Sequence, residues 1–347
     1  MPDDLPLRLI LDGQALVANW RWLAEHARAC AGAAIKADGY GLGAQEVLRR
    51  LGDAGCRDFF VATWAEAEAL GALPEGAQLS VLHGVRKEDM AAALGFGARP
   101  VLNSPAMVAR WKASAPGRPC DVMVDTGMNR LGLTVEQACS GLLDGLDIDV
   151  LMSHLACGDE ADSPMNALQR DRFALVAGRV GARRYSLANS AGICLGSAYG
   201  FDLTRPGIAL YGSAPRAEAA GRIAQVVRIE AQILQIRDVP AGDAIGYGAT
   251  YRAIGPTRVA ILNLGYADGY LRAFAGHGFA RRGGTVCPLV GRVSMDLIAV
   301  DIGALDAAEG EWLEVDYGLD QAARTTGLSQ YELLTGLGSR YQRRWTD

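Results

Sequence analysis

Residues 99–125 read RPVLNSPAMVARWKASAPGRPCDVMVD and contain one full repeat of the pattern that decides the fold. RPVL and DVMVD are short apolar runs typical of buried strands. The segment between them has apolar residues at three-to-four spacing, which is the helical period. A strand, a helix and a second strand in this order predict a βαβ unit with parallel strands.

The same alternation extends in both directions, from residue 14 to about residue 211. Eight βα units in roughly 200 residues match the lower size limit of a (β/α)8 TIM-type barrel, and a doubly wound sheet is the weaker alternative. We expect strands at 33–36, 59–62, 79–83, 99–102, 121–125, 149–154, 184–187 and 207–211, with helices at 14–30, 65–73, 104–113, 135–143 and 165–176.

After about residue 222 the pattern changes to strand-like runs separated by Gly, Pro and Asp turns. We therefore expect a barrel over residues 1–222 and a mainly β C-terminal domain over residues 223–347. The strand-like runs lie at 226–236, 258–264, 285–290, 297–302 and 312–317, and helical patterns return only at 319–326 and 330–337.

Composition narrows the class of function. The chain has 347 residues, 50% of them hydrophobic, and a formal charge of -5, which excludes a disordered or collagen-like protein. No dense basic block supports binding to nucleic acid or to a membrane surface. The seven cysteines are scattered and never spaced as C-x-x-C, which favours a reducing compartment. With an acidic N-terminus and no long apolar run, these features predict a cytoplasmic protein that acts on small molecules.

Lysine is rare in this chain, and one lysine is conspicuously placed. Only Lys36, Lys87 and Lys112 are lysines among the 34 basic residues. Lys36 ends the apolar run GAAIK, at the carboxyl end of the first expected strand, where barrels of this kind gather their reactive groups. Burial and neighbouring arginines would lower the pKa of this amine and make it a nucleophile for a carbonyl. The structural alternative is a strand-end lysine that reaches solvent.

Other polar residues are expected at the same end of the barrel. His83, 125–130, His154 and 189–190 follow the expected strands 3, 5, 6 and 7. The loop Asn189-Ser190-Ala191-Gly192 and the segment Arg205-Pro206-Gly207-Ile208 flank strands seven and eight, where barrels often bind a phosphate with backbone amides and a hydroxyl. Ordinary turns would also use such residues.

Eight segments resemble, in the same order along nearly the whole chain, the signature segments of bacterial alanine racemases, which are pyridoxal-phosphate enzymes of fold type III. Eight segments in register make a chance resemblance very improbable. They are AIKADGYGLG (34–43), DTGMNRLG (125–132), SHLACGDE (153–160), ANSA (188–191), RPGIALYG (205–212), IGYGATY (245–251), GYADGY (265–270) and VGRVSMD (290–296).

The resemblance implies pyridoxal 5′-phosphate as the cofactor, bound to the Lys36 amine and acting as an electron sink. Arg205 matches the arginine that faces the pyridine nitrogen, and a guanidinium that stays charged above pH ~12 cannot protonate it. The family's phosphate contacts match Tyr40, Ser190, the backbone of Gly207 and Ile208, and the hydroxyl of Tyr331.

Racemisation needs two acid-base groups on opposite faces of the α-carbon. The resemblance assigns the proton of the D-enantiomer to Lys36 and that of the L-enantiomer to Tyr247, with His154, hydrogen-bonded toward Arg205, linking this tyrosine to the cofactor ring. From position alone, His154 reads as a strand-end histidine and Tyr247 as a turn tyrosine.

The remaining matches concern the substrate and the assembly. Arg130 and the Met295 amide match groups that contact the substrate carboxylate, and Tyr266 and Arg292 match residues that line a narrow entrance for small amino acids. In the family, the residues that match Tyr247 and Met295 come from the partner subunit. The resemblance therefore implies a head-to-tail homodimer. It also implies a role in supplying D-alanine for the cell wall.

Two positions depart from the family pattern. Met123 stands where many members have a lysine, often carbamylated, that orients the arginine matched by Arg130. Ser186 stands where a histidine is frequent beside the cofactor.

Several functions remain open beside an alanine racemase. A serine or broad-specificity racemase, a decarboxylase, or a non-enzymatic carrier of pyridoxal phosphate would use the same scaffold. We expect no metal, because the histidines at 26, 83, 154 and 277 lack ligand spacing, which disfavours a metal-dependent isomerase.

Overall fold

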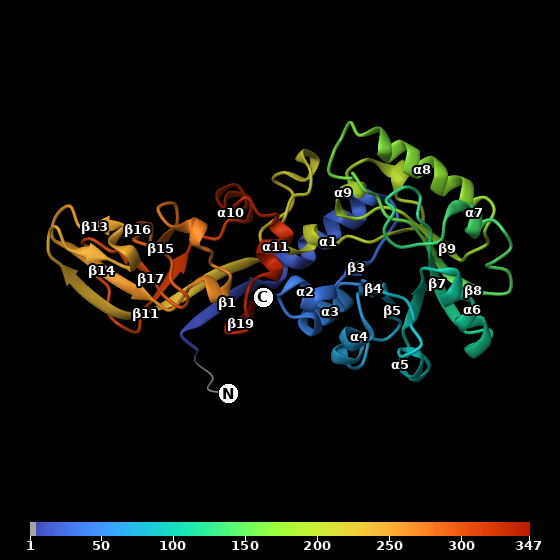
Figure 1. Cartoon of the computed structure of the whole chain (residues 1–347), viewed down its shortest axis with the longest axis horizontal. Helices are drawn as coiled ribbons and strands as arrows, with labels where there is room; N and C mark the ends of the chain where they lie inside the picture. Colours follow the sequence, from blue (N-terminus) through green and yellow to red (C-terminus); the bar gives the residue numbers. More distant parts are fainter. Residues whose placement is uncertain (1–4) are drawn as a thin grey trace. The chain divides into compact units, whose positions relative to one another are not determined.

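The computed structural model describes residues 5–347 and divides into two units (Figure 1). The barrel unit comprises residues 15–224, and the second unit comprises residues 5–14 with 225–347. The N-terminal strand β1 (Leu7–Asp12) belongs to the second unit because it pairs with β11 (Val227–Val239). The expected domain of residues 1–222 counted this strand with the barrel.

Parallel strands form the centre of the barrel unit. Seven of them are hydrogen-bonded in the order β3-β4-β5-β6-β7-β8-β9, and β10 pairs with β2. The amide of Ala34 donates to Pro206 and the amide of Arg205 donates to Ala188, so β10 closes the sheet between its first and last strands. The strands are β2 (Cys30–Ala31), β3 (Ala33–Ala34), β4 (Asp58–Val61), β5 (Gln78–Val81), β6 (Arg99–Leu102), β7 (Pro119–Met123), β8 (Asp147–Met152), β9 (Arg184–Ser186) and β10 (Leu203–Thr204).

This arrangement confirms the (β/α)8 barrel and not the doubly wound sheet, but the expected eighth strand at 207–211 is wrong. The strand is β10, two residues long, and Ile208–Tyr211 form the 3₁₀ helix η2. The sequence IALY is apolar because η2 is buried, and its apolar run therefore imitates a strand.

Several helices of the barrel unit begin at a capping residue. Ser104 accepts the amide hydrogen of Met107 and Pro105 occupies the first turn of α6, as helix N-termini prefer. The helices of this unit are α1 (Gly13–Ala27), α2 (Lys36–Tyr40), α3 (Ala44–Asp53), α4 (Trp64–Leu70), α5 (Met90–Gly95), α6 (Pro105–Ser114), α7 (Val135–Ala138), α8 (Pro164–Ala177) and α9 (Ser190–Ile193), with 3₁₀ helices η1 (Ser197–Tyr199), η2 and η3 (Ala217–Ala219).

A polar cluster lies inside the barrel. The fully buried Asp121 accepts hydrogen bonds from Arg99 Nε at 3.1 Å and from the Val150 amide at 3.0 Å. Ser80 Oγ donates to its other oxygen. Burial raises the pKa of this carboxyl, and Arg99 opposes that effect. Buried charges require such partners, so the cluster stabilises the barrel only as a complete set.

The second unit is a mainly β domain, as expected. Its eight-stranded sheet has the order β14-β17-β16-β15-β18-β11-β1-β19, and β11 also pairs with β14, which closes the strands from β14 to β11 into a ring. The further elements are β12 (Ala244–Ile245), β13 (Tyr251–Arg252), β14 (Thr257–Leu262), β15 (Phe279–Arg282), β16 (Thr285–Val290), β17 (Ile298–Asp301), β18 (Trp312–Val315), β19 (Gln342–Thr346), α10 (Leu319–Thr326), α11 (Gln330–Thr335), and 3₁₀ helices η4 (Tyr247–Ala249), η5 (Tyr266–Asp268) and η6 (Arg272–Phe274).

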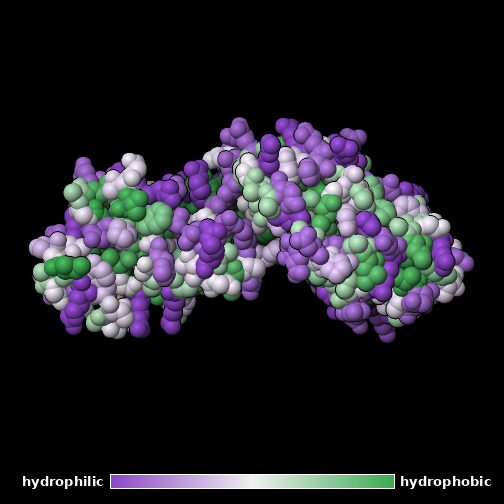
Figure 2. Space-filling view, turned by 90° about the horizontal axis from the view of Figure 1, so that it is seen from above, coloured by the Kyte–Doolittle hydropathy of each residue, from purple (hydrophilic) through white to green (hydrophobic). Residues whose placement is uncertain are grey.

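The surface is mixed in character. Figure 2 shows polar side chains over most of the visible face, with apolar patches between them. Within residues 5–347, no helix combines the length and the apolar character that crossing a bilayer requires.

Candidate active site

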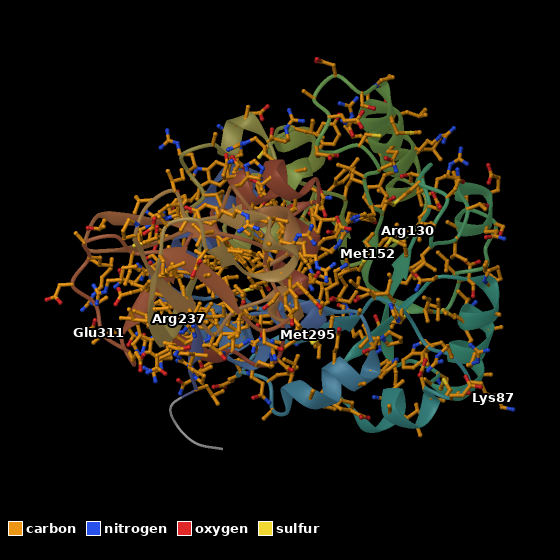
Figure 3. All side chains as sticks on the ribbon, turned by 60° about the vertical axis from the view of Figure 1, so that its left-hand side comes forward. Lys87, Arg130, Met152, Arg237, Met295 and Glu311 are labelled. Atoms are coloured by element: carbon orange, nitrogen blue, oxygen red, sulfur yellow. The ribbon has the colours of Figure 1, made fainter. Side chains whose placement is uncertain are left out.

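Lys36 differs from the other two lysines in its surroundings. It follows β3 and is partly buried, whereas Lys87 is exposed and lies at the outer edge of the barrel unit (Figure 3). Lys112 Nζ donates to the Leu142 carbonyl at 2.8 Å. Burial lowers the pKa of Lys36, Arg130 lowers it further, and Glu66 opposes both. A larger fraction of this amine is therefore neutral and nucleophilic than for an ordinary lysine.

The chain after Lys36 makes an unusual turn. Ala37, Asp38, Gly39 and Tyr40 have φ values of 52°, 52°, 61° and 55°, so α2 is left-handed from Ala37 onward. The left-handed helical conformation costs roughly 1–2 kcal/mol for each residue that is not glycine. Asp38 partly holds the turn, because its Oδ1 accepts the amide hydrogen of Ala44 at 2.9 Å. Strain of this kind, next to the candidate nucleophile, is typical of functional sites.

His154 lies among cations. It follows β8, and burial lowers its pKa to about 3, with further contributions from Arg205, Arg130 and Lys36. These groups therefore lie close enough to oppose a positive charge on the imidazole. The histidine is neutral at physiological pH, and its ring can donate or accept a proton in a hydrogen bond without adding charge.

Arg205 is buried and held by two strand ends. Its guanidinium donates to the Ser186 hydroxyl and to the Ser153 carbonyl. Burial lowers its pKa to about 10, so the group remains a cation at neutral pH. Ser186, at the position where the family often has a histidine, thus anchors Arg205. The expected hydrogen bond from His154 toward Arg205 stays a prediction.

A cradle for an anion lies beside η2. Ser190 Oγ accepts the amide hydrogens of Gly207 at 2.9 Å and of Ala209 at 3.3 Å. The Ile208 amide lies between them at the start of η2. A Cβ on Gly207 would lie 2.2 Å from the Tyr40 hydroxyl, so only glycine lets this hydroxyl approach the backbone at residue 207. Hydroxyls, backbone amides and a nearby amine are the donor set that a phosphate and an aldehyde require, and pyridoxal phosphate fits these residues.

Tyr40 is fixed in this cradle by a second tyrosine. The rings of Tyr40 and Tyr211 stack with their centroids 4.6 Å apart. Tyr211 is fully buried, and its hydroxyl donates to the Ala34 carbonyl at 2.9 Å. The cradle is therefore rigid on the side of Tyr40.

Arg130 is presented by a loop that Asp125 organises. The Asp125 carboxylate accepts the amide hydrogens of Gly127 at 2.8 Å, Met128 at 2.9 Å and Arg130 at 3.0 Å. The Arg130 side chain is exposed, and Figure 3 places it on the barrel unit. Met123 is buried and apolar, so its side chain offers no negative charge to the Arg130 guanidinium.

In the second unit, three of the signature segments meet. The Tyr266 amide donates to Ser294 and the Ala267 amide donates to Met295, both at 3.0 Å. Arg292 lies against Gly248, where a Cβ would come within 3.3 Å of the guanidinium. The loops that carry Tyr247, Tyr266, Arg292 and Met295 therefore form one contiguous cluster.

The side chains of this cluster are open to solvent in the single chain. Tyr247 is 74% exposed and Met295 is 53% exposed. Gly246 and Gly248 have φ values of 77° and 71°, which a residue with a side chain rarely adopts. Tyr331 lies on α11 of the same unit and is 47% exposed. Its approach to the phosphate stays a prediction.

Comparison with known proteins agrees with this geometry. Residues 11–215 match the model of the alanine racemase N-terminal domain, and residues 226–345 match that of the alanine racemase C-terminal domain. The chain belongs to the alanine racemase family. An alanine racemase of Acidiphilium cryptum is 42% identical over 96% of this chain and 97% of its own length.

Solved structures of the alanine racemase family superpose on nearly the whole chain. The alanine racemase of Bartonella henselae, solved with covalently bound pyridoxal phosphate, has a TM-score of 0.90 and 35% identity over 99% of this chain and all of its own. The biosynthetic alanine racemase of Pseudomonas aeruginosa has a TM-score of 0.85 and 33% identity, over 99% of this chain and 100% of its own.

Sequence reasoning missed three residues that organise this alanine racemase site. Glu66 contacts the turn after Lys36, and the T-x-x-E spacing of 63–66 was its only signal. The sequence predicts Asp125 at a strand end, but nothing in it indicates the backbone contacts by which Asp125 holds the loop. Arg340 donates to the buried Asp268, which lies in the same 3₁₀ helix as Tyr266, and no sequence motif indicates the role of Arg340.

Proposed function

We propose that this protein is an alanine racemase that uses pyridoxal 5′-phosphate, bound by Lys36, to interconvert L-alanine and D-alanine. The observation that carries the proposal is the placement of one partly buried lysine beside Arg130, His154 and the Ser190–Gly207 cradle, in a chain that matches both family domains. When bound, the cofactor supplies an electron sink for the negative charge that forms at the α-carbon.

Residues of the barrel unit would bind the cofactor and orient the substrate. The Ser190 hydroxyl, the backbone of Gly207 and Ile208, and the Tyr40 hydroxyl would hold the phosphate. The hydroxyl of Tyr331, which belongs to the second unit, would be a further contact. Arg205 would face the pyridine nitrogen as a cation that cannot give up its proton at neutral pH. By withholding a proton from the ring nitrogen, Arg205 would limit the electron sink and disfavour transamination and decarboxylation. Arg130 would pair with the substrate carboxylate.

Two side chains would move the protons. The Lys36 Nζ takes or delivers the proton on the face of the D-enantiomer, and its lowered pKa suits that exchange. The Tyr247 hydroxyl acts on the opposite face, and His154 links it toward Arg205. The Met295 amide contacts the substrate carboxylate, and Tyr266 and Arg292 restrict entry to small amino acids.

We further infer that the active form is a head-to-tail homodimer in which the partner subunit supplies Tyr247 and Met295. Their exposure in the single chain supports this inference, because groups that contact a bound substrate normally line an enclosed pocket. The seven free cysteines support a cytoplasmic location.

Mixing two inactive variants tests the activity and the dimer together. Lys36→Ala and Tyr247→Phe should each lose racemisation of L-alanine. After subunit exchange the mixed dimer regains one intact site, so about a quarter of the wild-type activity should return. No D-alanine from the wild-type protein would refute the racemase. Activity in the wild type without recovery in the mixture would refute the shared site.

A further inference from the structure

Glu66, on α4, contacts the turn that follows Lys36. Its Oε1 accepts the amide hydrogen of Ala37 at 2.9 Å, and its Oε2 accepts that of Ala62 at 2.6 Å. Ala37 follows strand β3 and Ala62 follows strand β4, which pair side by side. One carboxylate therefore ties together the carboxyl ends of two neighbouring barrel strands.

The contact to Ala37 acts on the peptide bond that begins at Lys36. Because this bond is planar, an acceptor that holds the N–H of Ala37 also fixes the orientation of the Lys36 carbonyl. Ala37 is the first residue of the left-handed turn, a conformation that persists only where neighbouring groups hold it. Glu66 supplies such a hold at the point where the turn begins.

Helix capping alone does not account for this contact. Thr63 Oγ1 accepts the Glu66 amide hydrogen at 3.2 Å, and Glu66 Oε2 lies 3.4 Å from the Thr63 amide, which completes the capping box of α4. The bond from Ala37 goes to the other oxygen, from a residue 29 positions away in the chain. The capping box does not require it.

Glu66 also contributes charge around the lysine. The charged groups that act on the Lys36 amine are Glu66 from α4 and Arg130 from the loop after β7, and His154 at the end of β8 in turn feels the charge of Lys36. Arg130 lowers the pKa of Lys36, and Glu66 raises it. Loss of this anion would leave the positive charge of Arg130 less opposed.

We propose that Glu66 is a positioning residue for Lys36: its carboxylate holds the left-handed turn through the Ala37 amide and, from that position, places a negative charge one residue from Lys36. The proposal rests on the proposed function only in that Lys36 is the residue that carries the cofactor. The contacts themselves involve no ligand.

Hydrogen exchange of the full-length protein, with and without pyridoxal phosphate, tests the mechanical part. Glu66→Ala should speed exchange of the Ala37 amide roughly 10- to 100-fold, as expected when a charge-assisted hydrogen bond is lost. Thr63→Ala is the matched control, because it weakens the same capping box but leaves the Ala37 contact. Equal Ala37 exchange in the two variants would overturn the proposal.

Labelling of the cofactor-free protein with acetic anhydride across pH tests the electrostatic part. Glu66→Gln removes the charge and retains most of the side-chain volume, and it should shift the pH profile of Lys36 acetylation to lower pH. Glu68→Gln removes an exposed charge from the same helix and should leave the profile unchanged. Identical profiles in the two variants would refute the charge balance. Both readouts are independent of turnover, so a failure of the racemase assay would remain a separate result.

Discussion

Gly207→Ala probes the cradle with a single methyl group. The new Cβ would lie 2.2 Å from the Tyr40 hydroxyl and 3.0 Å from the ring carbon that carries it. Gly207 has a φ of -128°, outside the left-handed region that favours glycine, so the predicted effect is the clash with Tyr40. Tyr40 cannot move aside, because its ring stacks on the fully buried Tyr211. Overpacking of this kind costs about 1–3 kcal/mol in the free energy of unfolding.

Removing the Tyr40 hydroxyl tests whether the clash with it causes the predicted loss of stability. In the double variant Gly207→Ala, Tyr40→Phe the 2.2 Å contact disappears and the nearest ring atom is 3.0 Å away. We expect the double variant to recover about 1 kcal/mol relative to the sum of the single variants, since the two sites are in contact.

The assay is urea unfolding of the full-length protein, with equilibrium dialysis of pyridoxal phosphate as a second readout. Gly181→Ala is the control, because its Cβ would meet nothing within 4 Å. Gly207→Ala should be less stable than this control and should bind the cofactor more weakly. Equal stability of the two variants, or no coupling with Tyr40→Phe, would refute the reasoning about the cradle.

Three further predictions concern stability. The pKa of His154 is lowered to about 3, so below about pH 6.5 the unfolded chain takes up a proton that the folded chain does not. As the pH decreases below about 6.5, the free energy of unfolding should therefore decrease by up to about 1.4 kcal/mol per pH unit. His154→Gln should flatten this slope, measured as urea midpoints at several pH values. Parallel slopes would contradict this. Asp121→Ala removes one of the two carboxylates that pair with the buried Arg99, Asp149 being the other, and also removes the acceptor of the Val150 amide. It should cost about 3 kcal/mol by urea unfolding, so a loss below about 1 kcal/mol would count against it. Arg340→Met removes two hydrogen bonds to the buried Asp268 and should cost about 2 kcal/mol, and an unchanged melting temperature would argue against that anchor.

Apolar runs predicted most of the barrel, because its buried parallel strands are continuous apolar segments. Some strands are too short or too polar to leave such a run. β10 has two residues, and β19 reads QRRWT. The segment IALY is the opposite case: it is apolar because η2 is buried, and an apolar run of four residues predicts a strand.

The chemistry of the site was more predictable than its geometry. Lys36 could be found from its rarity and its place at the end of an apolar run. The left-handed turn and the Glu66 contact could not, because they depend on a hydrogen bond between residues 29 positions apart. Arg340 contacts Asp268 across 72 residues, and no local pattern encodes such a pairing.

The most direct test of the account is to load the protein with pyridoxal phosphate, reduce it with borohydride and map the modified peptide. The chain has only three lysines, so the assignment is unambiguous. The account predicts the label on the peptide that contains Lys36 and none on those containing Lys87 or Lys112. A label on either of the other two, with Lys36 unmodified, would contradict it.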